Sequence, residues 1–210
     1  MKKILAIGGA VIKTAYKQLE EVIKLDEVEM LMHNGGSLFH DFQIGLGEID
    51  VRSSTSYPLT QLIKSFDINK PTSDVIWEWL ANKRKAPIHS IVGLCERKGI
   101  PVLTFTAMGA DFWHMFGDDW KIYAQPCEED FETLAARMRK DDFHYINMGS
   151  AVIHPEVFLK AVAVSQAENF RADVVDFLEM YRPRSRVAPY GEYYTMTHQE
   201  FFLKWINGEI

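Results

Sequence analysis

The stretch Lys3-Ile-Leu-Ala-Ile-Gly-Gly-Ala-Val-Ile-Lys13 decides the predicted fold. Residues 3–7 form a mainly apolar run, Gly8 and Gly9 interrupt it, and an amphipathic pattern continues to about Leu25. After the glycines, apolar residues recur every three or four positions, which is typical of one face of a helix. The pattern predicts a strand, a glycine turn and then a helix over about 10–25.

The same order of strand, small-residue turn and helix recurs along the chain. Apolar runs predict further strands at 28–32, 101–106, 143–147 and 172–178. Helices are expected near 37–47, 75–80, 88–98, 127–139 and 155–162. This alternation predicts one α/β domain over 1–210, with a doubly wound, mostly parallel sheet and a Rossmann-like three-layer α/β/α architecture.

Composition restricts the classes of function. The 210 residues carry 29 Asp and Glu against 23 Lys and Arg, a net charge of −6, so a protein that binds the nucleic acid backbone is not expected. The first apolar run ends at Lys13 without a signal cleavage site, and no stretch has the length of a membrane span. Two isolated cysteines fit neither a disulfide framework nor a thiolate zinc site. We therefore expect a cytoplasmic protein with no membrane partner.

The segment 48–72 interrupts the alternation. It is polar, rich in Ser and Thr, and contains Pro58 and Pro71. Loops of this length are commonly functional lids or insertions. We predict a flap or insertion here.

The candidate ligand site lies at the ends of the predicted strands. In a doubly wound sheet, ligands bind outside the carboxyl ends of the strands, at a switch point. Glycine there allows close backbone approach, and helix N-terminal amides favour anions such as a pyrophosphate. Neither the Gly-x-Gly-x-x-Gly fingerprint nor a P-loop is present. The candidate cofactor-binding residues are Gly8, Gly9, Asn34, Gly35, Gly36, Ser37, Thr106, Gly109, Gly149, Ser150 and Glu156.

Four residues near these turns are candidates for catalysis. Asp41 and Asp111 follow two of the turns and are candidate general bases or acceptors from ribose hydroxyls. His40 and His114 are candidate acid–base groups, because imidazole titrates near neutral pH. Glu156 has an alternative role, since a carboxylate at a helix start also stabilises the helix dipole.

Several stretches resemble the deoxyhypusine synthase family. Residues 30–42 resemble its Gly-Gly turn followed by two acidic residues, and 100–111 resemble its strand with a Thr-Asp-Gly-Ser turn. The stretch Asn-Met-Gly-Ser-Ala-Val-Ile-His-Pro-Glu-Val-Phe-Leu-Lys-Ala, residues 147–161, is similar to uncharacterised bacterial deoxyhypusine-synthase-like proteins, as is 176–183. The resemblance extends over about 4–187, apart from 48–72.

This resemblance implies an NAD-binding, often oligomeric Rossmann-like domain with the dinucleotide across the strand ends. It does not imply hypusine formation, because the family's Ser-Trp-Gly-Lys motif is absent and His40-Asp41 replaces the acidic pair. We therefore expect an enzyme that binds NAD, or another nucleotide, and a small-molecule substrate. The resemblance suggests a transferase, but the sequence does not identify the reaction.

Two other functions remain open. A metal-dependent hydrolase is the first, with mixed nitrogen and oxygen ligands from His33, His40, Asp41, Asp111 and His114. A non-catalytic nucleotide-binding module is the second. Stoichiometric zinc or manganese in the purified protein would favour the first, and a bound nucleotide without turnover would favour the second.

The aromatic stretch after Asp111 predicts a homo-oligomer. Large apolar side chains gather there, and one helical face buries only about half of such a run in its own core. The members are Phe112, Trp113, Met115, Phe116 and Trp120. A two-fold assembly is the simplest expectation. Light scattering after size exclusion checks it, and a clean 24.2 kDa species at micromolar concentration would contradict it.

Overall fold

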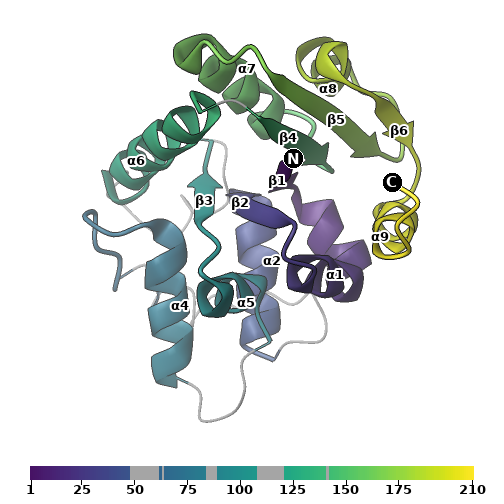
Figure 1. Cartoon of the computed structure of the whole chain (residues 1–210). Helices are drawn as coiled ribbons and strands as arrows, with labels where there is room; N and C mark the ends of the chain where they lie inside the picture. Colours follow the sequence, from purple (N-terminus) through teal and green to yellow (C-terminus); the bar gives the residue numbers. More distant parts are fainter. Residues whose placement is uncertain (48–61, 63, 84–88, 108–120, 141) are drawn as a thin grey trace.

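The computed structural model describes residues 1–47, 62, 64–83, 89–107, 121–140 and 142–210 (Figure 1). Within these residues, six strands form one all-parallel sheet in the order β3-β2-β1-β4-β5-β6. The strands are β1 (Lys2–Ile7), β2 (Val28–Asn34), β3 (Val102–Phe105), β4 (Phe143–Met148), β5 (Phe170–Asp176) and β6 (Tyr193–Thr195). This order confirms the predicted doubly wound α/β fold.

Helices cover both faces of the sheet, as Figure 1 shows. One face packs against α1 (Gly9–Lys24), α5 (Ile91–Lys98) and α9 (His198–Ile206), and the other against α6 (Lys121–Met138) and α7 (Ile153–Ser165). The remaining elements are α2 (Gly35–Gly45), α4 (Thr72–Lys83), α8 (Tyr181–Arg186) and the short 3₁₀ helix η2 (Ala188–Tyr190). No helix of the described ranges is long and apolar enough to cross a membrane.

The core follows from the two-residue period of the strands. In β1, Leu5 and Ile7 face α1, whereas Ile4 and Ala6 face α7, and all four are fully buried. A smaller apolar cluster, which includes Phe42, Leu62 and Ile76, joins α2 to α4. The central strand is therefore apolar on both faces, which is typical of strands in an all-parallel sheet.

The C-terminal part of the chain differs most from the prediction. The strand expected at 172–178 is Phe170–Asp176, and Leu178 is 72% exposed beyond it. The arginine-rich segment that follows forms α8, and β6 and α9 were not predicted. Earlier in the chain, α6 begins at Lys121 and contains Pro126, whereas the prediction began the helix after the proline. Of the predicted flap, residues 48–61 and 63 lie outside the described ranges.

The turns after β1 and β4 approach each other very closely. The Gly8 amide donates to the Met148 carbonyl at 2.8 Å. A Cβ at Gly8 would lie 1.9 Å from the Gly149 carbonyl oxygen, and Gly149 itself has a positive φ of 63°. Glycine is therefore required here for a close backbone contact and for a left-handed conformation. By contrast, a Cβ at Gly36 would meet only Asn34 Oδ1, at 3.5 Å.

Substitution by alanine is expected to change the unfolding free energy differently at Gly8 and at Gly36. Gly8→Ala is expected to cost more than about 3 kcal/mol of unfolding free energy, because backbone must move to relieve the overlap. Gly36→Ala has room within a helix and should leave the unfolding free energy unchanged or raise it by at most about 1 kcal/mol. Urea unfolding of both variants checks the difference, and equal stabilities would contradict it.

Candidate functional site

The candidate site lies at the carboxyl ends of β1 and β4, which are neighbours in the sheet. The helices that follow them, α1 and α7, cover opposite faces. This is the topological switch point at which parallel α/β sheets bind their ligands. Two of the turns predicted from the sequence, Gly8-Gly9 and Gly149-Ser150, therefore flank this crevice.

The turn after β2 reaches the same place. Asn34 caps α2, because its Oδ1 accepts from the Ser37 amide at 2.9 Å, and its Nδ2 donates to Ser150 Oγ at 3.5 Å. A Cβ at Gly9 would lie 3.4 Å from the Gly36 carbonyl carbon, so the starts of α1 and α2 are in contact. The structure thus brings three of the four selected turns together.

The fourth turn is described only in part. Thr106 lies just after β3 and its buried Oγ1 has no partner among the described residues. Gly109, Asp111 and His114 lie outside the described ranges, as does the aromatic stretch 112–120.

The α7 side of the crevice carries buried polar groups linked through Ser150. Asn147 Nδ2 donates to the Ser150 carbonyl at 3.0 Å, and the His154 amide donates to Ser150 Oγ at 3.3 Å. Asn147 Oδ1 and both ring nitrogens of His154 have no hydrogen-bond partner in the described part of the chain, although both residues are fully buried. Such orphaned polar atoms are rare in folded proteins.

Burial keeps three histidines near the crevice neutral at pH 7. It lowers the pKa of His154 to about 4, although the nearby His33 carbonyl has a smaller opposite effect. It also lowers the pKa of His33 to about 3 and that of His198 to about 4. His198 comes from α9 and lies against Gly149, where a Cβ would be 3.0 Å from its Cε1.

Sequence reasoning had not selected His154 or His198 as site residues. A signal for His154 was present, because it follows a glycine–serine turn at a helix start. None was available for His198, because its helix was not predicted.

His40 and Asp41 are adjacent in the sequence but point to different places. The His40 ring lies beside Gly9, at 3.3 Å from its would-be Cβ, and Nδ1 is 3.0 Å from Gln43 Oε1. Partial burial lowers the pKa of His40. This histidine therefore lies near the crevice and remains a candidate acid–base group.

The Asp41 carboxylate instead caps α5. It accepts from Ser90 Oγ at 2.8 Å and from the amides of Ile91 and Val92 at 2.7 and 3.0 Å. Burial raises the pKa of Asp41 to about 6, and these three hydrogen bonds oppose the rise. The geometry gives this carboxylate a structural task away from the strand ends.

Glu156 forms ion pairs beside the first turn of α7. Its Oε1 lies 3.3 Å from Arg182 Nε and 3.3 Å from Arg186 Nε, both in α8. The pairs are partly exposed, so they contribute little to stability. They tie α7 to α8 and leave the buried part of the crevice without this charge.

Within the described residues, no three His, Cys, Asp or Glu side chains are placed to hold a metal ion. Of the metal ligands considered for a hydrolase, the structure describes His33, His40 and Asp41. The other two, Asp111 and His114, lie outside the described ranges.

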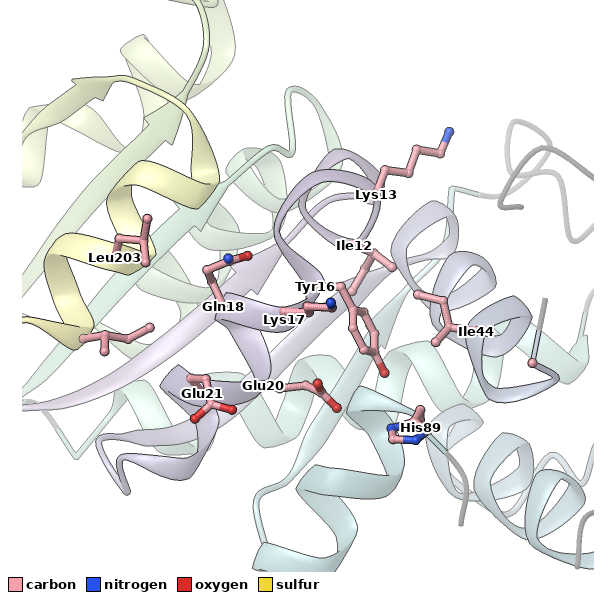
Figure 2. A pocket seen from close by; sticks show the side chains of 12 residues that line it. Ile12, Lys13, Tyr16, Lys17, Gln18, Glu20, Glu21, Ile44, His89 and Leu203 are labelled. Atoms are coloured by element: carbon pink, nitrogen blue, oxygen red, sulfur yellow. The ribbon is translucent and has the colours of Figure 1, made fainter. Parts of the chain in front are cut away.

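A large groove lies elsewhere, along the outer side of α1 (Figure 2). Its volume is about 820 Å³, and its lining includes Tyr16 of α1, Ile44 of α2 and Leu203 of α9. None of the selected site residues lines it. We place the candidate site by topology and by its orphaned polar atoms rather than by the size of a hollow.

No protein-family model and no curated protein matches this sequence. Solved structures share its fold. The apo structure of ArgZ, an arginine dihydrolase of the ornithine–ammonia cycle in cyanobacteria, has a TM-score of 0.63 at 13% identity and covers 98% of this chain. The ternary complex of AgrE with ornithine and NAD+ has a TM-score of 0.63 at 14% identity and covers 99%. A candidate deoxyhypusine synthase from Entamoeba histolytica has a TM-score of 0.62 at 9% identity and also covers 99%.

The chain spans only part of these proteins. It matches 29% of ArgZ, 30% of AgrE and 74% of the Entamoeba protein. Similarity at these identities supports the fold alone. The deoxyhypusine synthase is one of several enzymes with this fold.

The Asp41→Asn variant distinguishes a structural role of this carboxylate, as the cap of α5, from its predicted role in catalysis or ribose binding. If it acts as the α5 cap, the variant is expected to lose about 2–3 kcal/mol of unfolding free energy, because an amide nitrogen would face hydrogen-bond donors. Ligand binding should be unchanged at a temperature where the variant is folded. Asp67→Asn is the control, since Asp67 is exposed in a turn and should lose at most about 0.5 kcal/mol. Wild-type stability with lost binding would contradict the capping role.

Proposed function

We propose that this chain is the dinucleotide-binding part of an enzyme that uses NAD and acts on a small molecule. The observation that carries the proposal is the convergence of turns at the switch point between β1 and β4. Three helix N-termini meet there, from α1, α2 and α7. Their backbone dipoles favour the phosphates of a dinucleotide.

The individual residues support this assignment in different ways. The first turn of α1 has no acidic residue and its N-cap makes no side-chain bond, so its amides face no competing anion from that turn. Gly36 has no positive φ and open space beside it, so close approach by a ligand explains this glycine better than backbone geometry does. Asn34 and Ser150 would hold ribose hydroxyls. Bound NAD would supply a hydride acceptor.

The finer features remain proposals. AgrE binds NAD+ in its ternary complex with ornithine, and we extend the cofactor class, not the substrate, to this chain. The reaction, a cytoplasmic location and a homo-oligomeric state are predictions from the sequence. Among the described residues, His40 is the candidate for acid–base chemistry. Asp111 and His114 are further candidates.

A Gly36→Val variant tests the proposal. The added carbons would occupy the space through which a phosphate approaches α2, so NAD+ affinity should fall about tenfold or more. Ala163→Val, an exposed position in α7, adds the same β-branched side chain far from the strand ends and should bind as the wild type does. Calorimetry at a temperature where both variants are folded measures the two NAD+ affinities. Unchanged affinity in Gly36→Val would remove the α2 turn from the site.

Mass spectrometry of small molecules released from the denatured wild-type protein tests the cofactor class. A dinucleotide supports the proposal. A mononucleotide without turnover favours the non-catalytic module, and stoichiometric zinc or manganese favours the hydrolase.

A further inference from the structure

A row of basic residues crosses the sheet near the amino ends of its strands, on the face that α9 covers. Lys3 of β1 is paired in register with His144 of β4, and His144 is paired with Arg171 of β5. Side chains alternate along a strand, so His144 shares its face with Ile146, which belongs to the same core cluster as Trp205 of α9. The row therefore lies at the opposite edge of the sheet from the switch point.

Asp173 of β5 holds two residues of this row in place, and it is only 1% exposed. Its carboxylate accepts from Arg171 Nε at 3.0 Å on both oxygens and from the Glu192 amide at 2.8 Å, and His144 Nε2 lies 2.8 Å from Oδ2. Burial alone would raise the pKa of Asp173, but the hydrogen bonds from His144 and Arg171 lower it overall. The carboxylate is therefore ionised at neutral pH, and the proton of the shared hydrogen bond is on His144 Nε2.

The basic row keeps hydrogen-bonding groups that the protein itself does not use. Arg171 engages its partners through Nε and Nη2, and its Nη1 has no hydrogen-bond partner among the described residues. Lys3 Nζ donates to Glu27, which leaves further protons on the ammonium group. Nδ1 of His144 also has no partner in the described ranges, and it is not a buried atom. The groups that remain free are thus mainly donors.

A cavity of about 350 Å³ is lined by these groups, and its volume lies within the range of small-molecule sites. Nε1 of Trp205 donates to Glu27 at 3.0 Å, and Lys3 Nζ lies 4.7 Å from the centroid of the Trp205 ring, so this ring is held in one position. The lining includes Lys3, His144, Arg171 and Asp173 of the sheet and Phe201 and Trp205 of α9. The cavity therefore has a polar, charged floor and an aromatic wall.

The free groups determine which charge of ligand the cavity suits. A cation would approach Lys3 and Arg171, and the buried Asp173 already has donors on both oxygens. Glu192, the other acidic side chain of the described lining, is 64% exposed. A carboxylate would contact Arg171 directly and stay further from Asp173, and Coulomb interactions weaken with distance. A planar carboxylate also matches the geometry of the guanidinium group.

We propose that this cavity binds a small organic acid with an apolar body, with its carboxylate on Arg171 Nη1 and its body against Trp205 and Phe201. Asp173 is a positioning residue, because it contacts Arg171 and His144 from the buried side. Buried ion pairs add little net stability, so orienting a ligand-binding arginine explains why this carboxylate is buried. The site is separate from the switch point, and the inference does not rest on the proposed function.

Three probes test this chemistry on the wild-type protein. 3-Phenylpropionate has a carboxylate and an apolar body, 3-phenylpropionamide has the same shape without the charge, and acetate lacks the body. The first is expected to bind at least about tenfold more tightly than either of the others. NMR titration of the tryptophan indole N–H signals measures the affinities. Equal affinity of the acid and the amide, or no binding of the acid at millimolar concentration, overturns the inference.

The same titration locates the site through the Trp205 indole signal, which the Trp205→Phe variant identifies. This signal should shift in a saturable way as 3-phenylpropionate is added, because the probe would lie against the ring. A saturable shift of other indole signals while that of Trp205 stays in place would put the probe elsewhere and overturn the inference.

Two substitutions of Arg171 test its contact with the carboxylate. Arg171→Gln removes the charge and should weaken binding of 3-phenylpropionate about tenfold or more. Arg171→Lys keeps a charge beside Asp173 but lacks the planar fork, so it should also weaken binding. Arg139→Gln removes an exposed arginine after α6 and is the matched control, which should bind as the wild type does. Thermal melting shows which variants are folded at the temperature used.

Unchanged affinity in a folded Arg171 variant, or an equal loss in Arg139→Gln, overturns the organic-acid site. Titration with NAD+ is independent of these results. A protein that binds NAD+ but not 3-phenylpropionate contradicts this inference alone, and one that binds 3-phenylpropionate but not NAD+ contradicts the proposed function alone.

Discussion

The contact between the backbones of Gly8 and Gly149 is the constraint on which the rest of the structure depends. It lets the turns after β1 and β4 touch, and from this point α1 and α7 leave toward opposite faces of the sheet. The missing side chain of Gly149 also leaves room for His198 of α9, because a Cβ there would lie 3.0 Å from the His198 Cε1. Because a side chain on either glycine would meet backbone or a buried ring, the close approach of the α1 and α7 starts depends on two missing Cβ atoms.

Two of the carboxylates selected from the sequence are directed away from the switch point. Asp41 is turned toward the start of α5, and Glu156 is held by two arginines of α8. The histidines that remain are neutral, because burial disfavours the imidazolium form. The helix N-termini that meet at this point would favour the phosphates of the proposed dinucleotide.

The alternation of strands and helices could be predicted because the buried central strands are apolar on both faces and the helices show a clear period. The parallel order and the switch point followed from the same pattern. The end of the chain could not be predicted in this way. β6 has three residues and pairs with a neighbour on one side, which is too short for an alternating pattern, and α9 follows it directly.

The site was predictable as a place but not residue by residue. Glycine-rich strand ends indicated the switch point, where the structure brings Asn34 Nδ2 within 3.5 Å of Ser150 Oγ. A ligand-binding role of these two residues stays a prediction. The partners of Asp41 lie about 50 residues further along the chain, so its sequence position alone suggested chemistry where the structure shows a cap. His154 and Asn147 are noticeable only through what they lack, namely hydrogen-bond partners, and no sequence pattern reports that.

The two edges of the sheet are both short. β3 has four residues and β6 has three. Beside β6, Asp173 of β5 accepts hydrogen bonds from Arg171 and from the Glu192 amide, and it also pairs with His144. Short edges offer few free backbone groups to an incoming strand. Another polypeptide can therefore extend this sheet only by a few hydrogen bonds. A contact of the described part with another chain would therefore depend mainly on helix surfaces, and ordered edge-to-edge aggregation has little backbone on which to start.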